Sequence, residues 1–168
     1  MARQGENLKE LVDCNELIDS TVRLAESEAR IYDIQIEFDR GNDLPPALVD
    51  GVQIQQVALN LLRNGMEAMI AFDERKGCPI NIATRLNDDN EIEVAVTDCG
   101  GGVPKSRMDK LFTPFSTTKK SGMGMGLSIS QAIIRAHGGR IDFCNTDPCG
   151  AKFWFTIPAA KKESHNGR

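Results

Sequence analysis

The chain has 168 residues, a length that suits one globular domain, because domains cluster near roughly 100–150 residues. Apolar residues make up 40% of it, and 20 basic against 24 acidic side chains give a net charge of −4, which argues against a nucleic-acid-binding surface as its main role. Its longest largely apolar stretch, 52–70, is interrupted by glutamines, asparagines, an arginine and a glutamate, so we expect no membrane span. The polar first residues show no signal region, and the five cysteines show no CxxC spacing; both features favour a reducing, cytoplasmic location.

The first fifty residues predict short elements of both kinds. Residues 1–12 are polar, and we expect them to form a linker or the end of a preceding helix. Apolar residues at helical spacing predict a helix over 15–29, and alternation over 34–38 predicts a strand. Two consecutive prolines then mark a turn before a short strand at 47–49.

The middle of the chain predicts its longest helix and a β-hairpin. Asp50 followed by Gln53 resembles a capping box, which begins a helix that extends to about Phe72. Two alternating runs, 80–86 and 92–96, are separated by a short polar turn and therefore predict two antiparallel strands.

The last third predicts a long loop followed by a helix and two strands. Residues 100–121 are rich in glycine, proline and polar residues, as in loops that carry function. A helix over 125–136 is ended by Gly138 and Gly139, and strands follow at 140–144 and 152–157. The charged tail, 159–168, is expected to be flexible.

Polar residues of the long helix form one narrow stripe on an otherwise largely apolar surface. At 100° per residue they fall within about 80° of one another. They are Gln53, Gln56, Asn60, Asn64 and Glu67. Amide oxygens are neutral, hard ligands that suit Mg²⁺ and phosphate-bound water. A core helix whose amides are satisfied internally is an equally good interpretation of the stripe alone.

Two glycine-containing motifs follow predicted element boundaries. Asp98-Cys-Gly100-Gly-Gly102 comes directly after a strand, where a carboxylate and closely approaching backbone suit the amino group of a purine. Gly122-Met-Gly124-Met-Gly126-Leu127 opens the last helix, where backbone N–H groups can point at phosphates. The spacing is that of neither a P-loop nor a dinucleotide-binding fingerprint. A glycine-rich turn with a capping aspartate is the alternative for the first motif.

A third segment lies between these motifs. Phe112 and Phe115 are expected to anchor the loop by burying their rings, while Lys119 and Lys120 lie where they can meet phosphate. An ordinary solvated loop is the alternative for the two lysines.

In order, these blocks resemble the nucleotide-binding boxes of bacterial sensor histidine kinases. The matching residues are Asn60-Leu-Leu-Arg-Asn64, Asp98-x-Gly100-x-Gly102, Phe112-x-Pro-Phe115 and Gly122-x-Gly-x-Gly126-Leu127. The resemblance extends over 13–158, which we take as the domain, and is strongest to the FixL-like, PAS-linked branch. It implies a catalytic and ATP-binding domain of the Bergerat (GHKL) fold. That fold is an α/β (α+β) two-layer sandwich, with a mixed, mostly antiparallel sheet packed against three helices and an ATP lid.

The resemblance also implies a role for each matched residue, with ATP and Mg²⁺ as cofactors. Asn64 would ligate Mg²⁺, Asn60 would support the triphosphate, and Asp98 would accept from the adenine amino group. Asn60, Asn64 and Lys119 are the implied catalytic residues. The implied nucleotide-binding residues are Asn60, Asn64, Asp98, Gly100, Gly102, Phe115, Lys119, Gly122, Gly124, Gly126 and Leu127. Gly65 stands where the family more commonly has alanine, and this change lowers the helix propensity of the position by up to about 1 kcal/mol.

The family's phosphate-accepting histidine lies on a separate dimerisation domain. Neither His137 nor His165 has that context, and we expect His137 to be structural. The implied partners are the kinase's own dimerisation domain and a response-regulator receiver domain, with no nucleic acid and no membrane contact. The isolated domain is expected to be a monomer and the full kinase a homodimer.

Three alternatives remain at this point. They are a hydrolytic ATPase of the same fold, a serine kinase of the anti-sigma type, and a nucleotide-binding docking domain without chemistry. The hydrolytic members place a glutamate four residues before the metal-binding asparagine, where this chain has Asn60, which cannot accept a proton.

Overall fold

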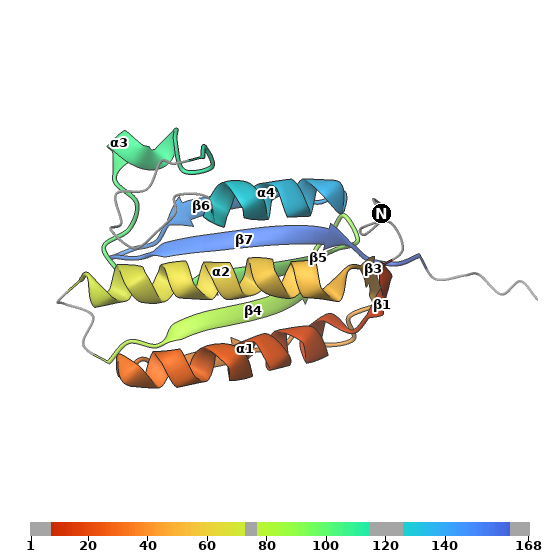
Figure 1. The fold of residues 1–168 in the computed structure, drawn as a ribbon, viewed down its shortest axis with the longest axis horizontal. Coiled ribbons are helices and arrows are strands. Elements are labelled where there is room, and N and C mark those ends of the chain that lie inside the picture. The colour runs from red at the N-terminus through yellow and green to blue at the C-terminus, as the bar shows by residue number, and fades with distance from the viewer. Residues whose placement is uncertain (1–7, 73–76, 115–125, 162–168) are drawn as a thin grey trace, which may run out of the picture.

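A five-stranded sheet covered on one face by helices forms the body of the molecule (Figure 1). The computed structural model describes residues 8–72, 77–114 and 126–161. The strand order is β2-β4-β5-β7-β6. Their bounds are β2 Ile36–Asp39, β4 Ile80–Leu86, β5 Glu91–Thr97, β6 Ile141–Asn145 and β7 Ala151–Pro158. Only the β2–β4 pair is parallel, so the mixed, mostly antiparallel sheet expected from the sequence is confirmed.

Three long helices lie side by side across the sheet: α1 (Cys14–Ile31), α2 (Gly51–Ile70) and α4 (Gly126–Ala136). Helix α2 lies in the middle and contacts both of the others. Its apolar side is fully buried, through Ile54, Val57, Ala58, Leu61, Leu62, Met66 and Met69. The polar stripe predicted for this helix therefore occupies the part of its surface that the core leaves open.

Helix α2 begins where the sequence predicts and ends slightly earlier. The Asp50 carboxylate accepts hydrogen bonds from the N–H groups of Val52 and Gln53, at 3.1 and 3.3 Å, as an N-cap does. The helix ends at Ile70 rather than near Phe72. Strands β4 and β5 pair antiparallel, which confirms the predicted hairpin.

Two segments differ from the expectation. Glu10–Val12 forms strand β1, paired antiparallel with β3 (Ala47–Val49), and is not part of a linker or helix. Three residues are too few to show a period, and the partner strand lies far along the chain. In the predicted long loop, Lys105–Met108 forms a short helix, α3. The tail begins later than expected, because the backbone of Ala160 donates to the Pro46 carbonyl at 2.8 Å; residues 162–168 lie outside the described part.

His137 fastens the end of α4 to the beginning of α2. It is 8% exposed; its Nδ1 lies 2.8 Å from the Ile133 carbonyl, and its Nε2 accepts the Asp50 N–H at 3.2 Å. A neutral imidazole with the proton on Nδ1 satisfies both bonds. His137 therefore has the structural role that the sequence predicts: it holds Asp50, the N-cap of the helix that carries the amide stripe.

Replacing His137 should therefore destabilise the fold. We expect His137→Ala to lower the free energy of unfolding by about 1–3 kcal/mol, because it leaves the buried Asp50 N–H without its acceptor. Denaturant unfolding followed by circular dichroism measures this difference. The exposed Arg135→Ala in the same turn is the control and should change stability by no more than about 0.5 kcal/mol. Equal losses in the two variants would contradict the role given to the imidazole.

Candidate nucleotide-binding site

The predicted site residues converge from three elements. Asn60 and Asn64 lie on α2, Asp98 follows the last residue of β5, and Gly126 is the first residue of α4. The Asn60 amide nitrogen donates to the Ser130 hydroxyl at 3.1 Å, which joins α2 to α4. A Cβ at position 126 would lie 2.8 Å from the Asn60 amide oxygen, so the beginning of α4 approaches this amide closely because Gly126 has no side chain.

Ser130 contacts a predicted site residue although the sequence motifs do not include it. It is 3% exposed and holds Asn60 in one orientation. Its position one helical turn after Gly126 is the signal that could have identified it, since residues four apart share a helix face. Asn64, one turn further along α2, is half-buried on the same stripe.

Asp98 is a buried carboxylate, with 4% of its surface exposed. Its Oδ1 accepts the N–H of Gly100 at 2.8 Å and the N–H of Ala151 at 3.2 Å. Burial raises the pKa of this carboxyl group, while the two backbone N–H groups act in the opposite direction. Among the described residues both of these bonds end on Oδ1, which suits Oδ2 to a ligand that donates a hydrogen bond.

Two glycines let Asp98 and the segment after it lie directly on α2. A Cβ at Gly65 would meet the Ile80 side chain at 2.5 Å and the Asp98 Cβ at 3.3 Å. A Cβ at Gly100 would approach the backbone of Ala68 to 2.8 Å. The departure at position 65 therefore has a packing reason beyond its cost in helix propensity, because it gives Asp98 room beside the helix.

Gly102, the third glycine of the motif that begins at Asp98, lies in a turn held by side-chain hydrogen bonds. Gly102 has φ +82°, a conformation that favours glycine. Next to it, the Asn145 side chain accepts the N–H of Val103 at 2.8 Å and donates to the Val103 carbonyl at 3.0 Å. Asn145, on β6, is a residue that the sequence reading missed, because only the fold brings β6 to this loop.

Phe112 anchors the following loop to the sheet. Its ring lies 6.3 Å from that of Phe143, which stacks on Phe153 at 5.6 Å. The expectation that Phe112 buries its ring against the protein is therefore confirmed. Leu127, near the start of α4, is partly buried against the core. The remaining predicted contacts lie outside the described residues: Phe115, Lys119, Lys120, Gly122 and Gly124.

Within the described ranges, no three His, Cys, Asp or Glu side chains gather as metal ligands. The amide oxygens of the stripe are candidate oxygen ligands for a magnesium ion that is also bound by the phosphates of a nucleotide. None of the described helices is long and apolar enough to cross a membrane.

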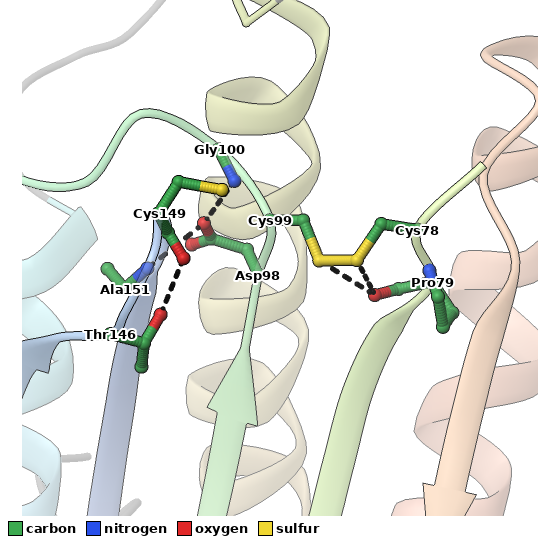
Figure 2. Close-up of a disulfide and its surroundings, with 8 residues drawn as sticks. All are labelled: Cys78, Pro79, Asp98, Cys99, Gly100, Thr146, Cys149 and Ala151. Carbon is green, nitrogen blue, oxygen red and sulfur yellow. Dashed lines mark hydrogen bonds between the residues drawn. A yellow bond between two sulfur atoms is a disulfide. The ribbon is translucent and has the colours of Figure 1, made fainter. Parts of the chain in front are cut away.

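A disulfide joins Cys78 and Cys99, a pairing that the spacing of the cysteines does not predict (Figure 2). Cys99 is the residue between Asp98 and Gly100, so the bond lies directly beside the buried carboxylate. Figure 2 shows Ala151 and Cys149 on one side of Asp98 and the disulfide on the other. The other three cysteines, Cys14, Cys144 and Cys149, are free.

Helices cover one face of a mixed sheet, and both the buried Asp98 and the beginning of α4 lie directly on the central helix α2. This arrangement suits a nucleotide-binding domain. Residues 49–161 match the family described as histidine kinase-, DNA gyrase B-, and HSP90-like ATPase, and the chain belongs to that family. Within it, this is a catalytic domain of the sensor histidine kinase type, as the following relatives indicate.

Over 159 residues the chain is 43% identical to the sensor protein FixL of Bradyrhizobium diazoefficiens, covering 94% of this chain and 30% of that protein. The sensor histidine kinase TmoS of Ectopseudomonas mendocina is 33% identical, and the match covers 95% of this chain and 16% of the length of TmoS. The chain thus spans less than a third of these relatives. The solved catalytic domain of the histidine kinase ThkA superposes with a TM-score of 0.77 at 33% identity, covering 89% of this chain and 95% of that domain. Full-length ShkA in complex with AMPPNP gives a TM-score of 0.79 at 26% identity, over 92% of this chain and 32% of its own.

The buried charge of Asp98 predicts a pH-dependent stability in the protein without nucleotide. Because the folded-state pKa is raised above the ordinary 3.8, the stability contributed by the protonated carboxyl is present below that value and is lost as pH rises through the folded pKa. Asp98→Asn has no such loss. We expect the stability of this variant relative to the unaltered chain to increase from pH below about 4 towards neutrality.

Chemical denaturation at a series of pH values measures this difference. Asp109→Asn, at an exposed position, is the matched control. Parallel pH profiles for Asp98→Asn and the unaltered chain would show that burial does not penalise this carboxylate.

Proposed function

We propose that this domain binds Mg²⁺–ATP and transfers its γ-phosphoryl group to a histidine on a separate dimerisation domain. The observation that carries the proposal is the close approach of Asp98 and Gly126 to α2, the helix that carries Asn60, in a fold that belongs to histidine kinase catalytic domains. Phosphoryl transfer needs mainly positioning and electrostatic stabilisation, which such a constellation supplies.

Each residue has a role in this proposal. Asp98 accepts from the adenine amino group through Oδ2, while Gly100 and Gly102 let the backbone approach the base. Asn64 holds Mg²⁺ through its amide oxygen, and the ion would neutralise charge on the phosphates. Asn60 supports the triphosphate from a position fixed by Ser130. The contacts proposed with the base and with the metal are taken from the matched motifs. The nucleotide contacts proposed for Lys119, Gly122 and Gly124 rest on the motifs alone, because these residues lie outside the described ranges.

The amide at position 60 favours a kinase over a hydrolytic ATPase. A water molecule needs a base to become a good nucleophile, and an amide does not accept a proton at neutral pH. Moreover, the Asn60 amide is already bonded to Ser130 through its nitrogen and packs against the beginning of α4 at Gly126. A docking domain without chemistry remains the second candidate, favoured only if nucleotide binds and no phosphate is transferred.

The phosphate acceptor must come from elsewhere if the proposal holds. His137 is buried and its Nε2 is already an acceptor of the Asp50 N–H, so the ring nitrogen that would attack phosphate faces a backbone group. For the whole protein we propose a cytoplasmic, homodimeric kinase whose dimerisation domain and response-regulator receiver domain are the partners. In that assembly this domain contacts neither nucleic acid nor membrane. When isolated, the domain is a monomer.

This chain should bind Mg²⁺–ATP without labelling itself. With γ-labelled ATP we expect no stable phosphate on the chain alone, and acid-labile phosphate on the matching dimerisation domain when that domain is added in trans. The reason is the buried and bonded state of His137, which leaves the domain without an available imidazole among its described residues. A control with the acceptor histidine of the added domain replaced should remain unlabelled. Stable self-labelling of the isolated chain would refute the proposal.

Adenine should be preferred over guanine because a carboxylate only accepts hydrogen bonds. Guanine would place a carbonyl oxygen opposite Asp98, and an unmade buried hydrogen bond costs about 1–3 kcal/mol. ATP should therefore bind at least roughly fivefold more tightly than GTP, measured by competition against a fluorescent nucleotide. Asp98→Asn, which can also donate, should lose much of this preference and some ATP affinity. If GTP competes as well as ATP against the unaltered chain, Asp98 is not in the base site.

A further inference from the structure

The disulfide between Cys78 and Cys99 lies at the edge of the proposed adenine site (Figure 2). Cys78 precedes β4, and Cys99 follows Asp98, the first residue after β5. Their Cα atoms are 6.3 Å apart, inside the usual range for a disulfide of about 4.4–6.8 Å. The backbone therefore needs no rearrangement to bring the two sulfurs together.

The hairpin itself keeps the two cysteines together. Strands β4 and β5 pair with Asn81 opposite Thr97, and continuing that register places Cys99 opposite Pro79. The Pro79 carbonyl lies 3.7 Å from the Cys78 sulfur and 3.6 Å from the Cys99 sulfur. As thiols, both groups can donate to that one oxygen, so the reduced pair has a place in the same fold.

Cys78 and Cys99 are also more exposed than a core cysteine. Cys78 and Cys99 are both half-buried. Cys14 is 2% exposed, and burial raises its pKa to about 12, which keeps it a thiol. Thiol–disulfide exchange requires access and thiolate, so the pair beside Asp98 is a better substrate for it than Cys14.

The bond restrains the segment that recognises the base. On one side, Gly100 lies directly on the backbone of Ala68 in α2 and donates its N–H to Asp98. On the other side, the disulfide ties Cys99 to the segment that leads into β4. Oxidation thus fixes residues 98–100 from both sides, with the carboxylate still bonded to the backbone of Ala151.

We propose that Cys78 and Cys99 are a reversible redox pair that regulates nucleotide affinity, an inference that rests on the proposed role of Asp98. The oxidant is a low-molecular-weight disulfide such as oxidised glutathione. One cysteine thiolate attacks it and releases one thiol; the second cysteine then attacks the mixed disulfide and releases the other. Two protein thiols are oxidised, one disulfide is reduced to two thiols, and a dithiol reductant reverses the exchange. In a reducing compartment, such bonds are usually transient and redox-sensing.

The oxidised form should bind the adenine nucleotide more tightly, because its recognition segment is already ordered. Ordering one rotamer-rich side chain on binding reduces affinity about twofold to tenfold. We therefore expect the oxidised chain to bind the nucleotide about twofold to tenfold more tightly than the reduced chain.

The test compares the full chain after treatment with oxidised glutathione and after treatment with dithiothreitol. Peptide mass mapping should find Cys78 linked to Cys99 in the first sample only, and titration with a fluorescent ATP analogue should give tighter binding there. Cys78→Ser keeps a donor towards Pro79 but cannot form the bond, so its affinity should be equal in the two conditions. Cys144→Ser, which removes an exposed free thiol, is the control and should respond as the unaltered chain does.

The outcomes separate this proposal from the one on which it rests. Absence of the linked peptide, or equal affinities despite its presence, would overturn the redox pair while leaving nucleotide binding intact. A response that persists in Cys78→Ser would assign it to another thiol and would also overturn the pair. If the linked peptide forms and neither sample binds nucleotide, the proposed function itself fails, and regulation of affinity fails with it.

Discussion

The close approach of the site segments to helix α2 is the constraint on which the candidate site depends. Gly100 brings the segment after β5 onto the backbone of Ala68, and Gly126 brings the beginning of α4 onto the Asn60 amide. A side chain at either position would push the two elements apart, because protein interiors are close-packed and leave no room for an added methyl group. The glycines thus set how closely the segment of Asp98 and the beginning of α4 lie on α2, and under the proposed function these groups would act on one nucleotide.

Asp98 shows how this packing is coupled to recognition. A carboxylate that is 4% exposed destabilises the folded state in its charged form, and the Gly100 and Ala151 N–H groups offset only part of that effect, since its pKa remains raised. A ligand that donates a hydrogen bond to this group would supply the missing stabilisation. The unfavourable charge is therefore consistent with a binding role, because the free energy that the empty site lacks is regained when the ligand binds.

The parts of this structure that the sequence predicted are those with a local physical signal. Helical periodicity, the Asp50 cap and the alternation of β4 and β5 each depend on neighbouring residues, and all three were confirmed. Strand β1 and the Cys78–Cys99 pair depend instead on contacts between distant segments, for which no period or spacing exists in the chain. For the same reason Ser130 and Asn145 were missed: each is an ordinary polar residue that gains its role from the segment that the fold places opposite it.

The neutral amide at position 60 has a consequence for the chemistry proposed here. Water is a poor nucleophile without a base, and Asn60 provides none, so ATP bound at this site should be hydrolysed slowly. A histidine side chain differs from water because the unprotonated nitrogen of its neutral imidazole is a better nucleophile and can attack phosphorus without first losing a proton. A site that presents Asn60 rather than a carboxylate at this position would therefore discriminate between the two nucleophiles by their chemistry. Under the proposed function, the phosphoryl group would then be retained until an imidazole from the separate dimerisation domain reaches it.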